Sequence, residues 1–315
     1  MKTEQFYEEI KKEFLDCLSQ DKLPWKREWE GRLPFAGFNY ATKSKYSGIN
    51  KFLLELICKK KNYLTNAFMT FNQVKAKKLS LDNAKGEGVP LQYWIPYDRN
   101  TKKFLTWDKY EEKKREKGFK ESDFPIYEKI FYVFNAKHIK NEDGKSLEDL
   151  ILAEKPERVK GDTVLAENIL HSYCNSEGIK VSFEGTRAFY SPALDSITLP
   201  KKENFYSDNA FASTFAHEVA HSTGHAKRMD RKFGAGDFEG ENNAIEELRA
   251  EVAASFLCSD FGIPMESILN NSKRYIQSWT QGLNDAPKKL LKAINDAEKI
   301  ALFIEERGNF ARKIA

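Results

Sequence analysis

Three side chains capable of joint chemistry lie within one short segment, "STFAHEVAHSTGHAKR". His217, Glu218 and His221 form an HExxH pattern, and His225 follows four residues later. On a helix, residues i and i+4 lie one turn apart on one face, so the rings of His217 and His221 can approach a single metal ion. The carboxylate of Glu218, beside the first ring, can take a proton from a water molecule. The pattern indicates a metal-dependent hydrolytic site.

A zinc ion with catalytic function needs a third protein ligand. Glu247 and Glu251 are four residues apart in "AIEELRAEVAASFLCSDF", so one carboxylate can bind metal while the other holds a ligand histidine. We expect Glu247 to be the ligand, because "ELRAE" resembles the E-x-x-A-D or E-x-x-A-N element of zinc peptidases, whose first Glu is the ligand. The opposite assignment, with Glu251 as the ligand, stays open. These donors predict one Zn²⁺ per chain, while manganese, iron or cobalt would also suit them.

His225 is a second candidate for the third ligand. Gly224 precedes it and favours the end of a helix, and the longer HExxHxxGxxH spacing is not met. We therefore expect His225 at a helix end or in contact with substrate. A hydrolytic site also needs a group that stabilises the oxyanion, for which Tyr190 and Tyr275 are candidates, and residues 197–199 could form the strand edge that pairs with a peptide.

Hydrophobic periodicity predicts the elements that position these residues. An opening helix carries Phe6, Ile10, Phe14 and Leu18 at four-residue intervals. A hairpin over 89–107, a charged insertion over 108–129 and a buried strand over 129–139 follow. In the second half, strand-like runs over 179–200 precede the histidine helix. Further helices are expected over 48–61, 162–177, 245–258, 265–278 and 285–306.

The charge of the chain is unevenly distributed. Residues 1–150 carry a net charge of +7 and residues 151–315 a net charge of −3. An acidic stretch over 141–161 with Pro156 and Gly161 separates the two regions, so we predict domains over 1–150 and 151–315. Nine lysines between Thr42 and Lys78 face one acid, Glu55. Such a basic field attracts polyanions.

Aromatic residues are interleaved with these lysines, a combination that suits single-stranded nucleic acid. We predict contacts from Lys43, Lys45 and Tyr46 in "NYATKSKYSG", together with Trp25 and Lys51. The first residues contain acids and no hydrophobic signal region, and no run of about 18 apolar residues exists. Four scattered cysteines form no CxxC pair. We therefore expect a cytoplasmic protein without disulfides or membrane contact.

Several segments in consistent order resemble ArdC-type antirestriction proteins. In the first half, these are "LPWKREWEG", "YSGIN", "AFMTFNQV", "KGEGVPLQYW" and "FYVFNAKHI"; in the second half, "GTRAFYSPALDSITLP", "FAHEVAHSTGHAKRMDR" and "EELRAEVAASFL". The resemblance implies an α+β protein: an N-terminal mixed α/β domain that binds single-stranded DNA, then a mostly helical zincin-like metallopeptidase domain with a small antiparallel sheet. This chain departs from the family after "PW", where "REWEG" replaces an expected proline, and in the insertion "DKYEEKKREKGFKESDF".

The family is typically encoded on plasmids and other mobile elements and protects incoming DNA from host restriction. The resemblance therefore implies that this protein binds single-stranded DNA without sequence preference and carries a zinc-dependent peptidase-type site. The first reading is a protease that is recruited to DNA and cleaves an unknown host protein. Two alternatives stay open. The protein could coat DNA and hold a structural metal, or it could be a peptidase that controls a repressor or toxin.

Overall fold

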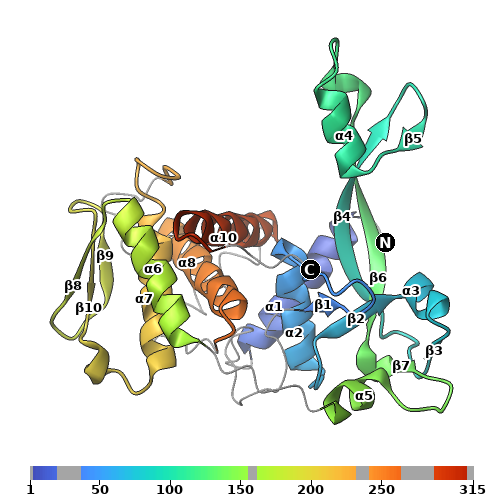
Figure 1. Cartoon of the computed structure of the whole chain (residues 1–315), viewed down its shortest axis with the longest axis horizontal. Coiled ribbons are helices and arrows are strands. Elements are labelled where there is room, and N and C mark those ends of the chain that lie inside the picture. Colours follow the sequence, from blue (N-terminus) through green and yellow to red (C-terminus); the bar gives the residue numbers. More distant parts are fainter. Residues whose placement is uncertain (1–2, 20–36, 155–161, 232–240, 264–286, 311–315) are drawn as a thin grey trace.

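The computed structural model describes residues 3–19, 37–154, 162–231, 241–263 and 287–310. Its N-terminal half mixes helices and strands, and its C-terminal half is mostly helical with one small sheet (Figure 1). This arrangement confirms the predicted fold class.

The N-terminal half begins with the predicted amphipathic helix, α1, whose residues Phe6, Ile10 and Phe14 are fully buried. Its helices and strands are α1 (Thr3–Ser19), β1 (Phe38–Asn39), α2 (Gly48–Lys60), β2 (Ala67–Thr70), α3 (Phe71–Ala76), β3 (Ser80–Leu81), β4 (Val89–Asp98), β5 (Lys103–Phe104), α4 (Trp107–Lys114), η1 (Glu121–Asp123), β6 (Ile126–Asn135), η2 (Ala136–His138), β7 (Ile139–Lys140) and α5 (Leu147–Ala153).

A five-stranded sheet in the order β1-β2-β6-β4-β5 organises this half. The predicted hairpin exists, since β4 pairs with β5, but β4 forms its long antiparallel ladder with β6, from Val89↔Val133 to Pro96↔Ile126. The far ends of β4 and β6 leave the body of the domain and carry β5, α4 and η1 between them (Figure 1). We call residues 93–129 the arm. It includes the segment that the sequence marked as a charged insertion.

The C-terminal half places its sheet beside a layer of helices. Its elements are α6 (Thr163–Ser176), β8 (Lys180–Phe183), β9 (Phe189–Ser191), β10 (Ser196–Leu199), η3 (Lys202–Asn204), α7 (Asp208–Ser222), α8 (Glu241–Asp260) and α10 (Pro287–Arg307). Helices α6, α7, α8 and α10 match the predicted helices, and the predicted helix over 265–278 lies outside the described residues.

The small sheet differs from the expectation in two respects. Its order is β8-β10-β9, with β10 parallel to β8 and antiparallel to β9. The sheet is therefore mixed, not antiparallel throughout. The prediction that residues 197–199 form a free strand edge is wrong, because β10 is the central strand and both of its sides are paired. The edge strands are β8 and β9.

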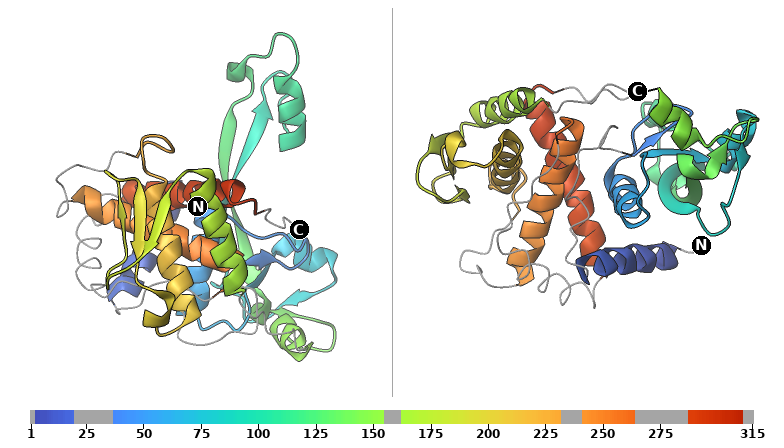
Figure 2. Two further views of the ribbon diagram at one scale, coloured as in Figure 1. Left: turned by 60° about the vertical axis from the view of Figure 1, so that its left-hand side comes forward. Right: turned by 90° about the horizontal axis from the view of Figure 1, so that it is seen from below.

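The two halves share one continuous hydrophobic core, which runs from Phe6 of α1 to Ile304 of α10. Helix α10 packs against α1 and α2 as well as against α6, α7 and α8. Figure 2 shows α10 between the N-terminal helices and the rest of the C-terminal half. The C-terminal helix therefore joins both halves.

A buried ion pair crosses the same junction. The Lys51 ammonium on α2 lies 3.1 Å from a carboxylate oxygen of Asp260 and donates to the carbonyl oxygen of Phe256 at 3.2 Å, both on α8. Lys51 is 1% exposed, so it cannot reach a nucleic-acid phosphate. The prediction that Lys51 contacts nucleic acid is therefore wrong. The number of lysines in a sequence segment does not tell which of them are exposed and which are buried between the two halves.

Two sequence expectations concern the whole chain. All four cysteines are free and buried, in agreement with the expected absence of disulfides. Among the described helices, none combines the length and the apolar character that a membrane crossing requires.

Candidate metal centre

The histidine helix α7 has a defined start and lies deep in the fold. The Ser207 hydroxyl accepts a hydrogen bond from the Ala210 N–H at 3.0 Å and so caps the first turn. Small residues at Ala212, Ala216 and Ala220 are buried along the helix. Small side chains allow close packing against α8, the helix that carries Glu247 and Glu251.

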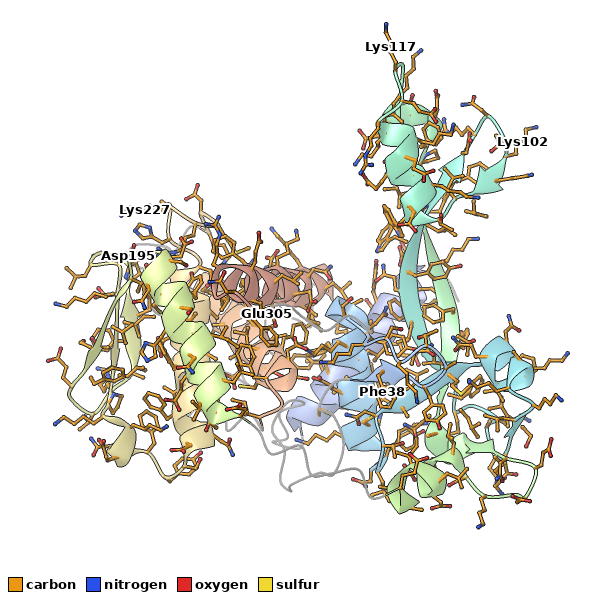
Figure 3. The ribbon with its side chains drawn as sticks, viewed as in Figure 1. Phe38, Lys102, Lys117, Asp195, Lys227 and Glu305 are labelled. Carbon is orange, nitrogen blue, oxygen red and sulfur yellow. The ribbon has the colours of Figure 1, made fainter. Side chains whose placement is uncertain are left out.

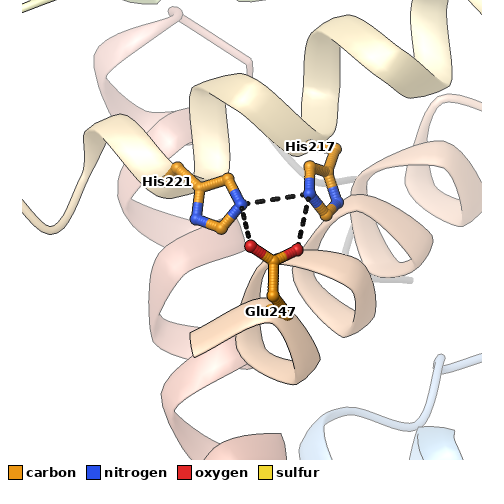
Figure 4. A group of neighbouring side chains, drawn as sticks. All are labelled: His217, His221 and Glu247. Carbon is orange, nitrogen blue, oxygen red and sulfur yellow. Dashed lines mark hydrogen bonds and ion pairs between the residues drawn. The ribbon is translucent and has the colours of Figure 1, made fainter. Parts of the chain in front are cut away.

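The structure brings the three predicted ligands together. The Nε2 atoms of His217 and His221 are 3.0 Å apart, and each lies 3.5 Å from one carboxylate oxygen of Glu247 (Figure 4). One donor atom from each residue lies within 4.8 Å of the others. This convergence of two imidazoles and one carboxylate from two packed helices is the geometry that a single metal ion requires.

The opposite ring nitrogens contact other carboxylates. Nδ1 of His217 lies 3.1 Å from the fully buried Glu251, and Nδ1 of His221 lies 3.7 Å from Glu246. When Nδ1 carries the proton and faces an acid, Nε2 presents its lone pair toward the shared centre. The geometry favours Glu247 as the ligand and Glu251 as the residue that orients His217.

Glu246 was not anticipated from the sequence. Arg231 binds its carboxylate through Nη2 at 2.8 Å and Nε at 3.2 Å, and Arg249 approaches it at 3.5 Å. The only sequence signal was the acid pair at 246 and 247, where adjacent helical residues point in different directions. Glu246 thereby connects His221 to Arg231, which follows the end of α7.

The charges around the centre determine the pKa values of these groups. Burial lowers the pKa of His217, but Glu247 and Glu251 outweigh burial and raise it well above the ordinary value. The pKa of His221 is raised to about 9, because Glu247 and Glu246 outweigh burial there too. Burial raises the pKa of Glu246, yet His221 and Arg231 hold it at about 2, and the pKa of Glu247 is also lowered. Ionised carboxylates facing two rings fit a divalent cation.

Glu218 lies next to His217 and is 7% exposed. Its charge contributes to the raised pKa of the His217 ring. A carboxylate at this place can accept a proton from a water molecule near the three donors. The position agrees with the role predicted for Glu218, and that role stays a prediction.

Other candidates lie away from this group. Nδ1 of His225, beyond the end of α7, accepts from the Lys227 N–H at 3.2 Å and lies 3.8 Å from Asp195. The Tyr190 hydroxyl donates to Asp195 at 2.8 Å and accepts from Arg228 at 3.2 Å. Tyr190 of β9 and His225 therefore both contact Asp195, and the oxyanion role of Tyr190 stays a prediction. Tyr275 lies outside the described residues.

The predicted nucleic-acid contacts that remain are close together. The Lys43 ammonium lies 3.7 Å from the ring centroid of Tyr40, and Lys45 lies 3.8 Å from Asp260. Tyr46 is partly buried, accepts from Asn39 at 3.2 Å, and burial raises its pKa to about 12. Lys43 and Lys45 are therefore better placed than Tyr46 to meet a ligand. Trp25 lies outside the described residues.

His171 of α6 packs against α7 and should make the folding stability of the protein depend on pH. Its ring centroid lies 4.8 Å from that of Phe215 on α7, and burial lowers its pKa, only partly offset by Glu167. The His171 ring therefore binds a proton more readily in the unfolded chain than in the folded chain. The folded state loses stability as the pH falls below about 6.5, the pKa of a histidine in the unfolded chain. With chelator present throughout, the wild type should lose more thermal stability between about pH 7.5 and 5.5 than His171→Gln does. Equal losses would contradict this assignment.

Two family models match separate parts of the chain. A family model described as a zincin-like metallopeptidase matches residues 168–296, and a model of the N-terminal domain of the anti-restriction factor ArdC matches residues 4–134. The models leave residues 135–167 between them, so the boundary near residue 150 stays a prediction.

Two Escherichia coli proteins called DNA primase TraC are 30% and 33% identical to 95% and 94% of this chain. The chain spans only 27% and 19% of their lengths. The Mn(II)-bound crystal structure of the antirestriction ArdC protein from plasmid R388 is 23% identical, with a TM-score of 0.68 over 96% of this chain and 97% of that one. Its metal-free structure has a TM-score of 0.67. This likeness shows that the described parts of this chain share the fold of those structures.

Proposed function

We propose that this chain, an ArdC-type antirestriction protein with a zincin-like metallopeptidase domain, has two activities. It binds single-stranded DNA, and it hydrolyses peptide bonds at a metal centre. Its task would be the protection of incoming mobile-element DNA from host restriction. The convergence of His217, His221 and Glu247, with Glu218 beside them, is the observation that carries the hydrolytic part.

The roles of the residues follow from their positions. His217, His221 and Glu247 would hold the cation, while Glu251 and Glu246 orient the two rings. A bound divalent cation would act as a Lewis acid and make a water molecule more acidic. Glu218 accepts the proton of the attacking water and returns it to the leaving amine. Zinc suits the donors, and the manganese form of the R388 protein makes Mn²⁺ the first alternative.

A peptide would lie along β9, not along β10. Strand β9 packs against α7, and its one partner among the described strands is β10. A sheet edge can hydrogen-bond an extended peptide through backbone groups. Strand β9, and not residues 197–199, is therefore the candidate strand edge for a peptide.

The DNA-binding part is supported by the basic excess of the N-terminal half and by the exposed lysine loop at Lys43 and Lys45. Contacts to phosphate make binding weaker as salt rises. A DNA-coating protein with a non-catalytic metal remains the second candidate, since the same basic surface supports it.

Transfer of unmodified DNA into a restricting recipient tests this proposal. Recipients that receive DNA encoding the wild-type protein should survive in greater number than those that receive a vector alone. With Glu218→Gln, lost protection would support the peptidase, and full protection by a variant that retains metal would support DNA coating. No protection by the wild type would reject the antirestriction function.

A further inference from the structure

The arm exposes aromatic rings on both sides: Trp94 and Trp107 on the side of α4, and a cluster of four rings on the other side. Tyr93, Phe104 and Tyr127 are 39%, 46% and 45% exposed, and the partly buried Tyr97 lies among them. Ring centroids are 5.1 Å apart for Tyr97 and Phe104, and 5.7 Å apart for Tyr97 and Tyr127. Strand register places all four side chains on the same side, because Tyr97 pairs with Phe104, Ile95 with Tyr127, and Tyr93 with Lys129. We call Tyr93, Tyr97, Phe104 and Tyr127 the aromatic face.

The arm does not need this face for its own core. On the opposite side of β4, Pro96 and Asp98 are buried, and α4 packs against the strand. The buried Tyr110 of α4 contacts Phe119 and Phe124 there. Clustered exposed rings cost free energy in water, so a cluster on the side away from the core indicates a binding surface.

Positive charge accompanies the rings. The Lys129 ammonium lies 3.3 Å from the Phe104 ring centroid. Residues 99–120 contain nine Lys or Arg against four Asp or Glu. Lys102 and Lys103 are exposed and form no ion pair within the described part of the chain. Figure 3 shows Lys102 and Lys117 projecting from the arm, far from the rest of the molecule in that view.

We infer that the aromatic face is a second contact surface for single-stranded nucleic acid, separate from the lysine loop at Lys43 and Lys45. Bases of a single strand expose faces that stack on Tyr and Phe, while the nearby lysines meet the phosphates. A protein partner fits less well, because lysine is depleted from protein interfaces. The inference rests on the proposed DNA binding and specifies where part of the strand lies.

Fluorescence anisotropy with a labelled oligothymidine tests the aromatic face. Loss of one stacked base weakens binding about 5-fold or more, so the double variant Phe104→Ala/Tyr127→Ala should bind at least about 20-fold more weakly. The slope of affinity against salt should stay as in the wild type, because no phosphate contact is removed. Tyr127→Phe keeps the ring and should bind as the wild type does.

Phe183→Ala is the matched control, since Phe183 is an aromatic residue of the C-terminal sheet with 41% exposure. It should leave the affinity unchanged. If the wild type binds the oligothymidine and the double variant binds it with equal affinity, the aromatic face is not a DNA surface. The proposed function would then remain intact. A wild type that binds no oligothymidine would overturn both. Unchanged thermal unfolding of the double variant establishes that the arm still folds.

Discussion

Glu218→Gln is expected to reduce hydrolysis of a quenched fluorescent casein at least about 100-fold, because an amide cannot accept the proton of the attacking water. The bound metal should stay at the wild-type level, since Glu218 is not among the three converging donors. The glutamine has nearly the same volume as the buried glutamate, so the fold should be retained. Initial rates and metal content measured on one preparation give both results.

The control for this substitution is Glu203→Gln, an exposed residue of η3. It should hydrolyse casein at the wild-type rate. A Glu218→Gln enzyme that is as fast as the control would show that another group accepts the proton. Wild-type protein that binds metal and cleaves nothing would point to the DNA-coating alternative.

The second large effect is expected from Glu247→Ala. The carboxylate of Glu247 approaches both ring nitrogens at 3.5 Å, so its removal takes away one of three donors and should lower metal affinity more than about 100-fold. Glu251→Gln removes an acid that contacts Nδ1 of His217 and is not among the three converging donors, so metal affinity should fall by about 10- to 100-fold. Titration with Zn²⁺ and Mn²⁺ against a chelating indicator measures each value.

The order of these two effects decides between the two glutamates. A greater loss with Glu251→Gln than with Glu247→Ala would make Glu251 the ligand. Glu203→Ala, at the same exposed position as the first control, should bind metal like the wild type. The folded state of each variant is checked by thermal unfolding in the presence of chelator, where metal makes no contribution.

For the metal centre, the sequence predicted the relation of residues within one helix better than the relation of residues on different helices. The four-residue spacing of His217 and His221 fixes their relation within one helix, so geometry alone places both rings on one face. Glu247 belongs to another helix, and no periodicity relates α7 to α8. Its assignment came from the resemblance of "ELRAE" to a known peptidase element. Glu246 had no such resemblance and was missed.

The failures concern residues whose role depends on the neighbouring element. Ile197 has the alternating apolar pattern of a strand, but the pattern does not say how many sides of that strand are paired. Lys51 lies on an amphipathic helix among other lysines, and only tertiary structure reveals Asp260 opposite it. The composition likewise predicted that part of the arm is a surface insertion. Only the register of β4 and β6 shows that its aromatic side chains lie on one side.

The junction at Lys51 has a consequence for how such a protein is inherited. Either half transplanted alone would lose the Lys51–Asp260 ion pair and would expose the apolar surfaces that α10 shares with α1 and α2. Breaking a buried ion pair costs about 3 to 5 kcal/mol, so recombination that separates the halves is penalised. The two domains should therefore move between genomes as one block, and the TraC primases, which match 95% and 94% of this chain within much longer proteins, agree with such a unit.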